Sequence, residues 1–357
     1  GIVGKSNNPA VNVSVLFQIG AAYQEANEFL KAQEAYAKIL KLYPDSAYAD
    51  YAQYQLGSLQ LKSLEYNQAI NSFKLMMKNY PQSKLAGDAV YSLGMAYLQK
   101  ADYPASCEVL SKFQNEFKDN PLRPQAFYLL GTALLSLGEI NEALNIFKDI
   151  LKLYPQDIEL LQKTEYEIAD CYYKLGQENE ALRLFKLLRA KYPDSNITAD
   201  VLWWLGQYYY RGNDLELARR YFGSLAKDFP NNRLSADAFY ALGLTLYKLG
   251  DYAGAKLYYA KRLELADIKD VADIRFNLAE ALEANSEFDA AVKQYLLAAD
   301  LYLKSSHLSI RALLRAAKLD EDKENFKQAL EIYKRIIEGG SQEAKFAQER
   351  VERINAK

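Results

Sequence analysis

Apolar residues along this chain recur at spacings of three and four, which is the pattern of amphipathic helices. The pattern is plain in the segments LFQIGAAY (Leu16–Tyr23) and ALRLFKLL (Ala181–Leu188). Short polar turns such as Leu249-Gly250-Asp251 separate neighbouring segments, and there glycine can end one helix while aspartate caps the next. The sequence therefore predicts an all-α protein whose helices are joined by short turns.

The predicted helices come in pairs that repeat about every 37 residues. Each pair contains a small residue in its first helix, such as Gly20 in the first pair. A second small residue, here Ala32, lies 12 positions later, and a large apolar residue, here Tyr36, lies 4 positions further on. Neither helix of a pair can bury its apolar face alone, so the pairs are expected to stack into one continuous solenoid. The first small residue marks nine units, at steps of 36 to 38 residues: Gly20, Gly57, Gly94, Gly131, Ala169, Gly206, Gly243, Ala279 and Ala317.

This unit resembles the tetratricopeptide repeat, a two-helix unit with small, aromatic and proline residues at fixed offsets. The first unit carries Gly20, Tyr23, Ala32, Tyr36 and Pro44 at those offsets, and the resemblance extends over about residues 12–340. The usual repeat has about 34 residues, and here 3 are added between the proline and the next small residue. The resemblance implies an all-α, right-handed superhelical solenoid of about nine repeats, followed by a C-terminal capping helix.

The residues around the turns between repeats narrow the resemblance to a subgroup of the family. Segments such as YPDSAYADYAQYQLG (43–57) and YPDSNITADVLWWLG (192–206) are similar to repeats of bacterial envelope proteins. Two such proteins are the lipoprotein partner of the outer-membrane barrel assembly machine and the periplasmic coordinator of the Tol-Pal system. This similarity implies a role in a bacterial cell-envelope complex, located in the periplasm or elsewhere in the cell envelope, with the cytoplasm as the alternative.

Four parts are expected along the chain: a flexible leader at 1–11, seven repeats at 12–266, two divergent repeats at 267–340 and a capping helix at 341–357. The divergent repeats lack the Tyr-Pro pair that ends most second helices, so a softer joint is expected near 266–270.

Individual repeats also depart from the pattern. Repeat three has Ser106 in place of alanine and Lys118 in place of proline. In the capping helix, the apolar side is expected to consist of Phe346, Ala347, Val351 and Ile354.

Composition and charge exclude two classes of partner. The 44 Lys and Arg residues nearly balance the 46 Asp and Glu residues, for a formal net charge of −2. A protein that binds the nucleic-acid backbone needs a basic face, which this balance does not favour. No apolar run approaches the roughly 18 residues of a membrane span. The predicted partners are therefore proteins, without nucleic acid and without direct membrane insertion of this segment.

The residues that usually carry catalysis are sparse. His307 is the only histidine, and Cys107 and Cys171 are the only cysteines, placed on apolar helix faces of different repeats. Catalytic triads and metal sites normally need more of these residues. The sequence therefore predicts a protein that is not an enzyme and holds no metal or cofactor, with two buried thiols.

Two shorter segments contain residues typical of binding sites. Gly4-Lys5-Ser6 resembles the end of a phosphate-binding loop, but the upstream glycine and the preceding strand are missing. An acidic turn follows the first helix of the last repeat and is expected to be solvated rather than metal-binding; it contains Glu321, Asp322 and Glu324.

Aromatic residues recur at positions that the resemblance places in the concave groove of the solenoid. In the family, the first helix of each repeat lines that groove, at positions that include three before and four after the first small residue. These positions give the predicted partner-binding residues: Phe17, Tyr54, Tyr91, Tyr128, Tyr166, Tyr173, Trp203, Tyr210, Tyr240, Tyr247 and Phe276. Rigid rings with a polar tip offer a large contact area at little entropic cost. Packing between repeats explains any one ring equally well, whereas an exposed strip of this length indicates an interaction surface.

The residues next to these rings have other expected roles. Tyr209 is expected in the core, and Trp204 and Tyr208 are expected to pack between repeats. Charged residues of both signs flank the groove, and the acidic ones can also stabilise the first turns of helices. These residues are Asp88, Asp170, Asp200, Asp237 and Asp273, with Lys62, Lys174, Arg211 and Lys248.

The sequence thus predicts a non-enzymatic scaffold that binds a partner protein in its aromatic groove, as an extended peptide or as a helix. Two alternatives stay open. The rings could stack on the sugar faces of a glycan such as peptidoglycan, or the array could assemble with itself through its convex face or its ends.

Overall fold

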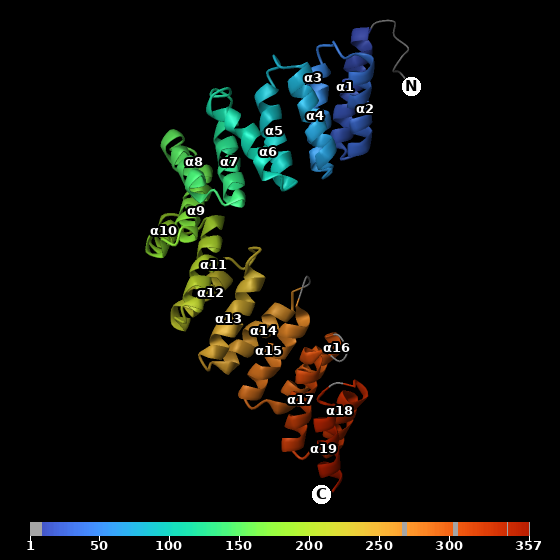
Figure 1. Ribbon diagram of the computed structural model, residues 1–357, viewed down its shortest axis with the longest axis vertical. Helices are drawn as coiled ribbons and strands as arrows, with labels where there is room; N and C mark the ends of the chain where they lie inside the picture. The colour runs from blue at the N-terminus through green and yellow to red at the C-terminus, as the bar shows by residue number, and fades with distance from the viewer. Residues whose placement is uncertain (1–8, 266–269, 303–305, 341, 357) are drawn as a thin grey trace. The chain divides into compact units, whose positions relative to one another are not determined.

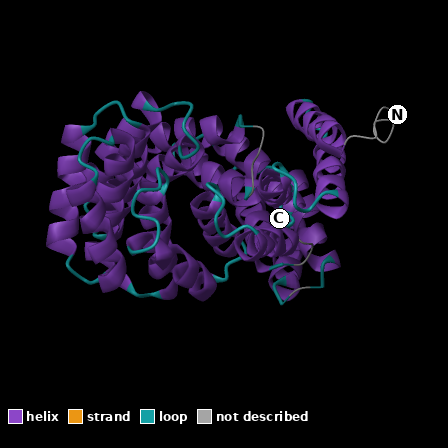
Figure 2. Cartoon of the chain, turned by 90° about the horizontal axis from the view of Figure 1, so that it is seen from above, coloured by secondary structure: helices purple, strands orange, loops and turns teal. Residues whose placement is uncertain are grey.

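The computed structural model describes residues 9–265, 270–302, 306–340 and 342–356. In these residues the chain forms nineteen α-helices and one 3₁₀ helix, and no strand (Figures 1 and 2). The all-α prediction is confirmed. Residues 1–8 of the expected leader and 266–269 of the expected joint lie outside the described residues, and α1 begins at Pro9, inside the range expected for the leader.

The chain divides into two compact units, unit 1 (1–188) and unit 2 (189–357). In unit 1 the first helices of the repeats are α1 (Pro9–Glu25), α3 (Ala49–Lys62), α5 (Ala86–Gln99), α7 (Arg123–Leu137) and α9 (Ile158–Lys174). The second helices are α2 (Phe29–Leu42), α4 (Tyr66–Asn79), α6 (Tyr103–Leu110), α8 (Ile140–Leu153) and α10 (Glu178–Lys191), whose last residues belong to unit 2.

Unit 2 repeats the same plan. Its first helices are α11 (Asn196–Arg211), α13 (Ser235–Lys248), α15 (Val271–Ala284) and α17 (His307–Asp322). Its second helices are α12 (Leu215–Asp228), α14 (Tyr252–Leu263), α16 (Phe288–Leu301) and α18 (Phe326–Glu338), and α19 (Ala344–Asn355) follows as the capping helix.

Helices that follow one another in sequence pack side by side, from α1 to α9 in unit 1 and from α11 to α19 in unit 2 (Figure 1). First helices of successive repeats also contact each other, as α3 with α5, α5 with α7, and α13 with α15. The first helices therefore form one layer in each unit. We call the exposed surface of this layer the first-helix face.

A small residue and a large ring interlock within most repeats. A β-carbon on Gly206 would lie 2.4 Å from the ring of Phe222, and one on Gly57 would lie 2.8 Å from the ring of Phe73. Both rings are completely buried or nearly so. The residues that define the repeat in the sequence are therefore the ones that let its two helices approach closely.

Repeat three keeps this packing with different residues. Ser106 is buried, and its hydroxyl donates a hydrogen bond to the Gly94 carbonyl at 2.8 Å, so the polar substitution for alanine is satisfied. Helix α6 ends at Leu110, and the chain continues as a 3₁₀ helix, η1 (Ser111–Gln114). The second helix of this repeat is thus shorter than its counterparts.

Every turn between the two helices of a repeat contains one residue with a left-handed backbone. Five of the nine are glycine or asparagine, for which this conformation carries little penalty. The nine residues are Asn27, Leu64, Ala101, Gly138, Gly176, Asn213, Gly250, Ser286 and Glu324. Three of these five are glycines, namely Gly138, Gly176 and Gly250. Leu64 has φ of 63° and an exposed side chain, so its turn is strained without compensating burial.

Replacing Leu64 with glycine is therefore expected to stabilise unit 1 by about 1 kcal/mol, because glycine removes the steric strain of the left-handed conformation. Urea denaturation followed by circular dichroism measures this as a higher midpoint. Leu64→Ala is the control, since it removes the side chain but keeps the strain. An equal gain from both variants would show that the exposed leucine, and not its backbone, is unfavourable.

Candidate functional site

The predicted partner-binding residues lie on the first helices of both units. In unit 1 they are Phe17, Tyr54, Tyr91, Tyr128, Tyr166 and Tyr173, and in unit 2 they are Trp203, Tyr210, Tyr240, Tyr247 and Phe276. Each is half-buried except Phe276. Half-buried rings can both pack within the repeat and contact a partner.

One side of most of these rings packs against the core ring of its own repeat. The ring centroids of Trp203 and Phe222 lie 5.5 Å apart, and those of Tyr240 and Tyr259 lie 6.0 Å apart. In unit 1, Tyr128 lies 5.9 Å from Phe147 by the same measure. These rings therefore do pack within their own repeats, which is one of the two roles expected from the sequence. The part of each ring that is not packed stays accessible on the first-helix face.

Two tyrosine hydroxyls link successive first helices. The Tyr128 hydroxyl donates to Glu167 Oε1 at 3.1 Å, which joins α7 to α9. In unit 2, Asn277 Nδ2 donates to the Tyr240 hydroxyl at 2.7 Å, which joins α15 to α13. Burial, and then the nearby Asp273 carboxylate, raise the pKa of Tyr240 above its ordinary value, so this hydroxyl is neutral at physiological pH.

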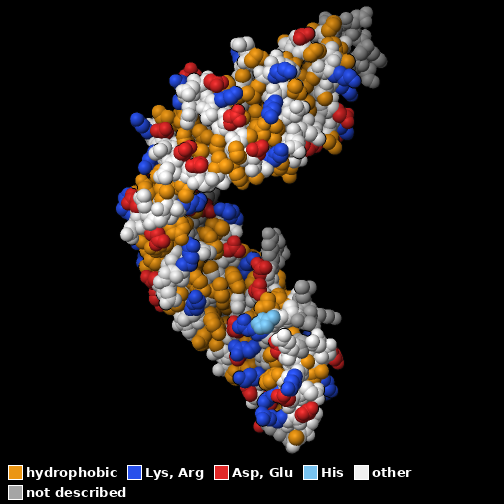
Figure 3. Space-filling model, in the orientation of Figure 1, with side chains coloured by type: hydrophobic (Ala, Val, Ile, Leu, Met, Phe, Trp, Pro, Cys, Tyr) orange, Lys and Arg blue, Asp and Glu red, His pale blue; other side chains and the backbone are white. Residues whose placement is uncertain are grey.

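Three of the predicted residues come together in unit 2 around one cavity. Trp203 and Tyr210 from α11 and Tyr240 from α13 line a cavity of about 320 Å³. Gln207, Phe222, Asp237, Ala241 and Leu244 complete its lining. We call it the aromatic cavity. Hydrophobic side chains gather over the helices from α11 to α15 in unit 2 (Figure 3).

A cation lies beside the aromatic cavity. Lys248 Nζ is 4.3 Å from the centroid of the Tyr210 ring, within the range of a cation–π contact. Asp237 is exposed where it lines the cavity. The cavity therefore combines aromatic walls with one charged group of each sign at its edge.

The rings around Trp203 mostly have the expected packing roles. Trp204 is buried and stacks on Tyr208, with ring centroids 5.2 Å apart. Tyr209 stacks on Tyr221 at 5.5 Å and is half-buried against the core of unit 2. Of this run of rings in α11, only Trp203 and Tyr210 line the aromatic cavity.

Phe276 differs from the prediction, because it is 6% exposed. The guanidinium of Arg311 lies 4.6 Å from the centroid of its ring and covers it. Arg311 is 35 residues away in the next repeat, and nothing in the sequence around Phe276 signals this cover. Phe276 therefore offers almost no ring surface to a partner.

Most of the flanking aspartates have partners within the protein. Asp200 pairs with Arg233 at 2.6 Å, Asp170 pairs with Lys174 at 2.5 Å, and Asp273 accepts a hydrogen bond from the Tyr302 hydroxyl at 2.6 Å. Asp200 connects the start of α11 to the turn before α13. Asp200 therefore links two successive repeats, whereas Asp170 is paired within α9 and Asp273 is bonded within its own repeat, and the sequence pattern indicated none of these partners.

The acidic turn at the end of α17 is only partly solvated, contrary to expectation. Asp322 and Glu324 are exposed, but Glu321 is buried. Glu321 accepts hydrogen bonds from the Tyr333 hydroxyl at 3.0 Å and from Arg350 Nε at 3.0 Å. The prediction failed because Arg350 comes from the capping helix, 29 residues further along the chain.

Residues with catalytic potential are dispersed. Cys107 is half-buried and Cys171 is buried, and both are free thiols. Burial raises the pKa of the Cys171 thiol to about 12, so it is protonated and a poor nucleophile at neutral pH. His307 begins α17 next to the N-cap residue Ser306. No group of three or more metal-ligating side chains occurs within the described ranges.

Comparison with family models matches four segments of the chain. A family described as outer membrane lipoprotein (YfiO) matches residues 49–202. Two families described as tetratricopeptide repeat match residues 14–46 and 204–270. A family described as soluble NSF attachment protein matches residues 262–349. Comparison with curated proteins finds no match.

Two solved structures are similar to this chain, and the first described here shares its fold. The C-terminal part of a repeat-containing protein from Cytophaga hutchinsonii is 16% identical, with a TM-score of 0.55, over 69% of this chain and 94% of that one. A repeat protein from Parabacteroides merdae is 12% identical, with a TM-score of 0.41, over 85% of this chain and 98% of that one. Among the described helices, none combines the length and apolar character needed to span a bilayer.

Proposed function

The chain is a tetratricopeptide repeat protein, and from this premise we propose that it is a non-enzymatic scaffold that binds a partner protein on its first-helix face. The aromatic cavity of unit 2 carries the proposal. It brings Trp203, Tyr210 and Tyr240 from two successive repeats to one place. Half-buried aromatic residues that meet at a concave site are the residues that most often dominate protein binding energy.

The size of the aromatic cavity suits a side chain of a partner segment. Its volume of about 320 Å³ is at the lower end of the range of about 300 to 1,000 Å³ for ligand pockets. An apolar side chain that enters it displaces water from three rings. Gln207 and Asp237 at its wall can bond to the backbone of the same segment. The partner is therefore a peptide or helix with a bulky apolar anchor.

The test is the double substitution Trp203→Ala with Tyr210→Ala. We expect partner binding to fall at least about tenfold, because two rings of one binding site are lost. Helicity measured by circular dichroism is expected to change little, since both rings are half-buried. The measurement is quantitative recovery of proteins from the source cell on immobilised native array and on the variant, followed by titration of the protein that is lost.

Tyr258→Ala is the matched control, because Tyr258 is a half-buried ring on the second helix α14. It is expected to recover the same partners as the native array. Equal recovery by the double variant and the native array would place the interface elsewhere. Loss of helicity in the double variant would mean that the two rings act mainly in packing.

We propose that this scaffold acts in a bacterial cell envelope. The match of residues 49–202 to a family described as outer membrane lipoprotein supports the proposal. Fractionation of the source cell with an antibody against the array is expected to place it with periplasmic or membrane proteins. Recovery with cytoplasmic markers would contradict the envelope assignment and leave the scaffold function intact.

A glycan is the second candidate ligand, favoured by a group of rings in unit 1. Tyr48 and Tyr51 are exposed, and their ring centroids lie 5.0 and 5.1 Å from that of Phe17. Flat exposed rings can stack on sugar faces. Calorimetric titration with peptidoglycan fragments decides between the ligands, and heat that is lost with Tyr51→Ala would support glycan binding at this group.

A further inference from the structure

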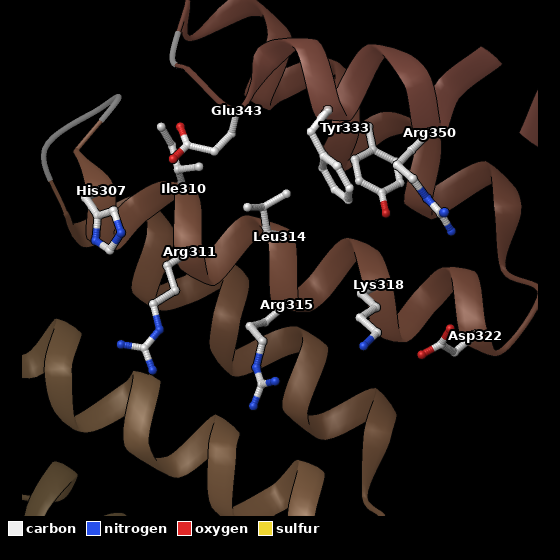
Figure 4. A pocket seen from close by; sticks show the side chains of 11 residues that line it. His307, Ile310, Arg311, Leu314, Arg315, Lys318, Asp322, Tyr333, Glu343 and Arg350 are labelled. Atoms are coloured by element: carbon white, nitrogen blue, oxygen red, sulfur yellow. The ribbon is translucent and has the colours of Figure 1, made fainter. Parts of the chain in front are cut away.

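A second pocket of unit 2 lies between α17, α18 and α19 (Figure 4). Its volume is about 490 Å³, and it shares no residue with the aromatic cavity. Ile310 and Leu314 of α17 form an apolar wall, and Phe346 of the capping helix faces the same space. We call it the terminal pocket.

Phe346 is 50% exposed, although its place in the capping helix predicted an apolar packing role. Ala347 and Ile354 of the same helix are buried as expected. A large ring that stays half exposed beside Ile310 and Leu314 leaves an apolar surface in contact with water. Covering this surface would release that water and favour binding.

The charged residues of the terminal pocket are mainly basic. Four Arg and Lys residues line it, Arg311, Arg315, Lys318 and Arg350, against the acidic residues Asp322 and Glu343. Three of the basic residues lie along α17 at spacings of four and three, so they project from one side of the helix (Figure 4). On the surface of unit 2, Lys and Arg side chains gather beside the histidine (Figure 3).

In two ion pairs of the terminal pocket, the arginine side chain is more exposed to solvent than its glutamate partner. Arg311 pairs with Glu280 of α15 at 3.2 Å, and the side chains are 51% and 19% exposed, respectively. Arg350 pairs with Glu321, whose side chain is 7% exposed against 27% for the arginine. Because the carboxylates lie beneath and the guanidiniums lie above, an approaching ligand meets positive charge first.

Lys318 adds a cation without an internal partner. Its side chain is exposed, and it makes no ion pair with any residue in the described part of the chain. It lines the pocket together with Leu314, one helical turn away. An ammonium group in this position can bind a carboxylate of a ligand without first breaking an ion pair of the protein.

We propose that the terminal pocket binds a short acidic peptide segment, with one large apolar side chain against Ile310, Leu314 and Phe346 and one or more carboxylates on Lys318 and Arg311. Charge complementarity selects the carboxylates, and the half-exposed ring selects the apolar side chain. Inorganic phosphate would leave the apolar wall uncovered. The proposal extends the scaffold function with a second site, and it does not depend on the aromatic cavity.

The test starts from a displayed library of random twelve-residue peptides, selected on the full native chain and, in parallel, on Lys318→Glu. We expect peptides enriched on the native chain alone to combine Asp or Glu with a large apolar residue. The most enriched sequence is then synthesised with a fluorophore, and its Kd is measured by anisotropy. Lys318→Glu is expected to weaken binding at least about tenfold by like-charge repulsion, and Phe346→Ala is expected to weaken it by a similar factor.

Lys327→Glu is the matched control, since Lys327 is an exposed lysine on α18 that does not line the pocket. It should keep the native Kd, and so should the double variant Trp203→Ala with Tyr210→Ala. Failure of the aromatic proposal therefore leaves this result unchanged.

Four results would overturn the proposal. The first is that the selected peptides show no enrichment of acidic residues, and the second is that a peptide with amides in place of its carboxylates binds with the same Kd. The third is that Lys318→Glu and Lys327→Glu weaken peptide binding equally. The fourth is that inorganic phosphate or phosphatidylglycerol vesicles displace the peptide from the pocket.

Discussion

Replacing Gly206 with leucine is expected to unfold the repeat formed by α11 and α12. A β-carbon at this position would lie 2.4 Å from the ring of Phe222, and that ring is 1% exposed and has no room to move. Trp203 also packs against this ring, with ring centroids 5.5 Å apart. Overpacking of a closed core commonly costs about 1 to 3 kcal/mol and occasionally more. We expect a loss of about 3 kcal/mol because a branched side chain adds three further carbons to the clash.

Intrinsic fluorescence measures this effect locally. The chain has only two tryptophans, Trp203 and Trp204, and both belong to α11. Urea denaturation followed by fluorescence therefore reports on the substituted repeat, while circular dichroism reports on all helices. We expect the fluorescence midpoint to fall further than the circular dichroism midpoint, because repeats are coupled mainly to their neighbours.

Gly223→Leu is the matched control for this substitution. Gly223 lies in α12 of the same repeat, and a β-carbon there would meet nothing within 4 Å. The control is expected to keep or raise the midpoint, because leucine is a better helix former than glycine. If both leucine variants denatured at the same urea concentration, close contact at Gly206 would not be what holds the two helices together.

Replacing Glu321 with alanine is expected to release the capping helix α19 from unit 2. The substitution removes the acceptor for Tyr333 and Arg350 and leaves both without their partner. Breaking a buried pair costs about 3 to 5 kcal/mol, and partial exposure of Arg350 reduces this to about 2 kcal/mol. Hydrogen exchange of the α19 amides should then accelerate about thirtyfold, since about 1.4 kcal/mol is a factor of ten.

Glu331→Ala provides the comparison, because Glu331 is an exposed glutamate on α18. Its substitution is expected to leave exchange in α19 unchanged. Exchange in α1 to α9 of unit 1 should not respond to either variant. Normal protection of α19 in Glu321→Ala would show that apolar contacts of Ala347 and Ile354 are sufficient to hold the cap.

The candidate site was only partly predictable from the sequence. Its position on first helices followed from the repeat register, and Trp203, Tyr210 and Tyr240 all lie in the first-helix layer. The exposure of each ring did not follow, because it depends on residues about one repeat away. Arg311 covers Phe276, whereas Trp203 stays half-buried and lines the aromatic cavity.

The sequence by itself determined the helices, their pairing and the core of each repeat. These features depend on contacts between residues within one repeat, such as Gly206 with Phe222. The period of the sequence pattern reports those contacts directly. The tertiary structure alone decided which polar and aromatic groups reach solvent. Glu321 is buried by Arg350, and Phe346 is left exposed over the terminal pocket. These outcomes depend on how side chains of separate repeats meet, and a pattern of apolar positions carries no information about the partner that arrives from another repeat.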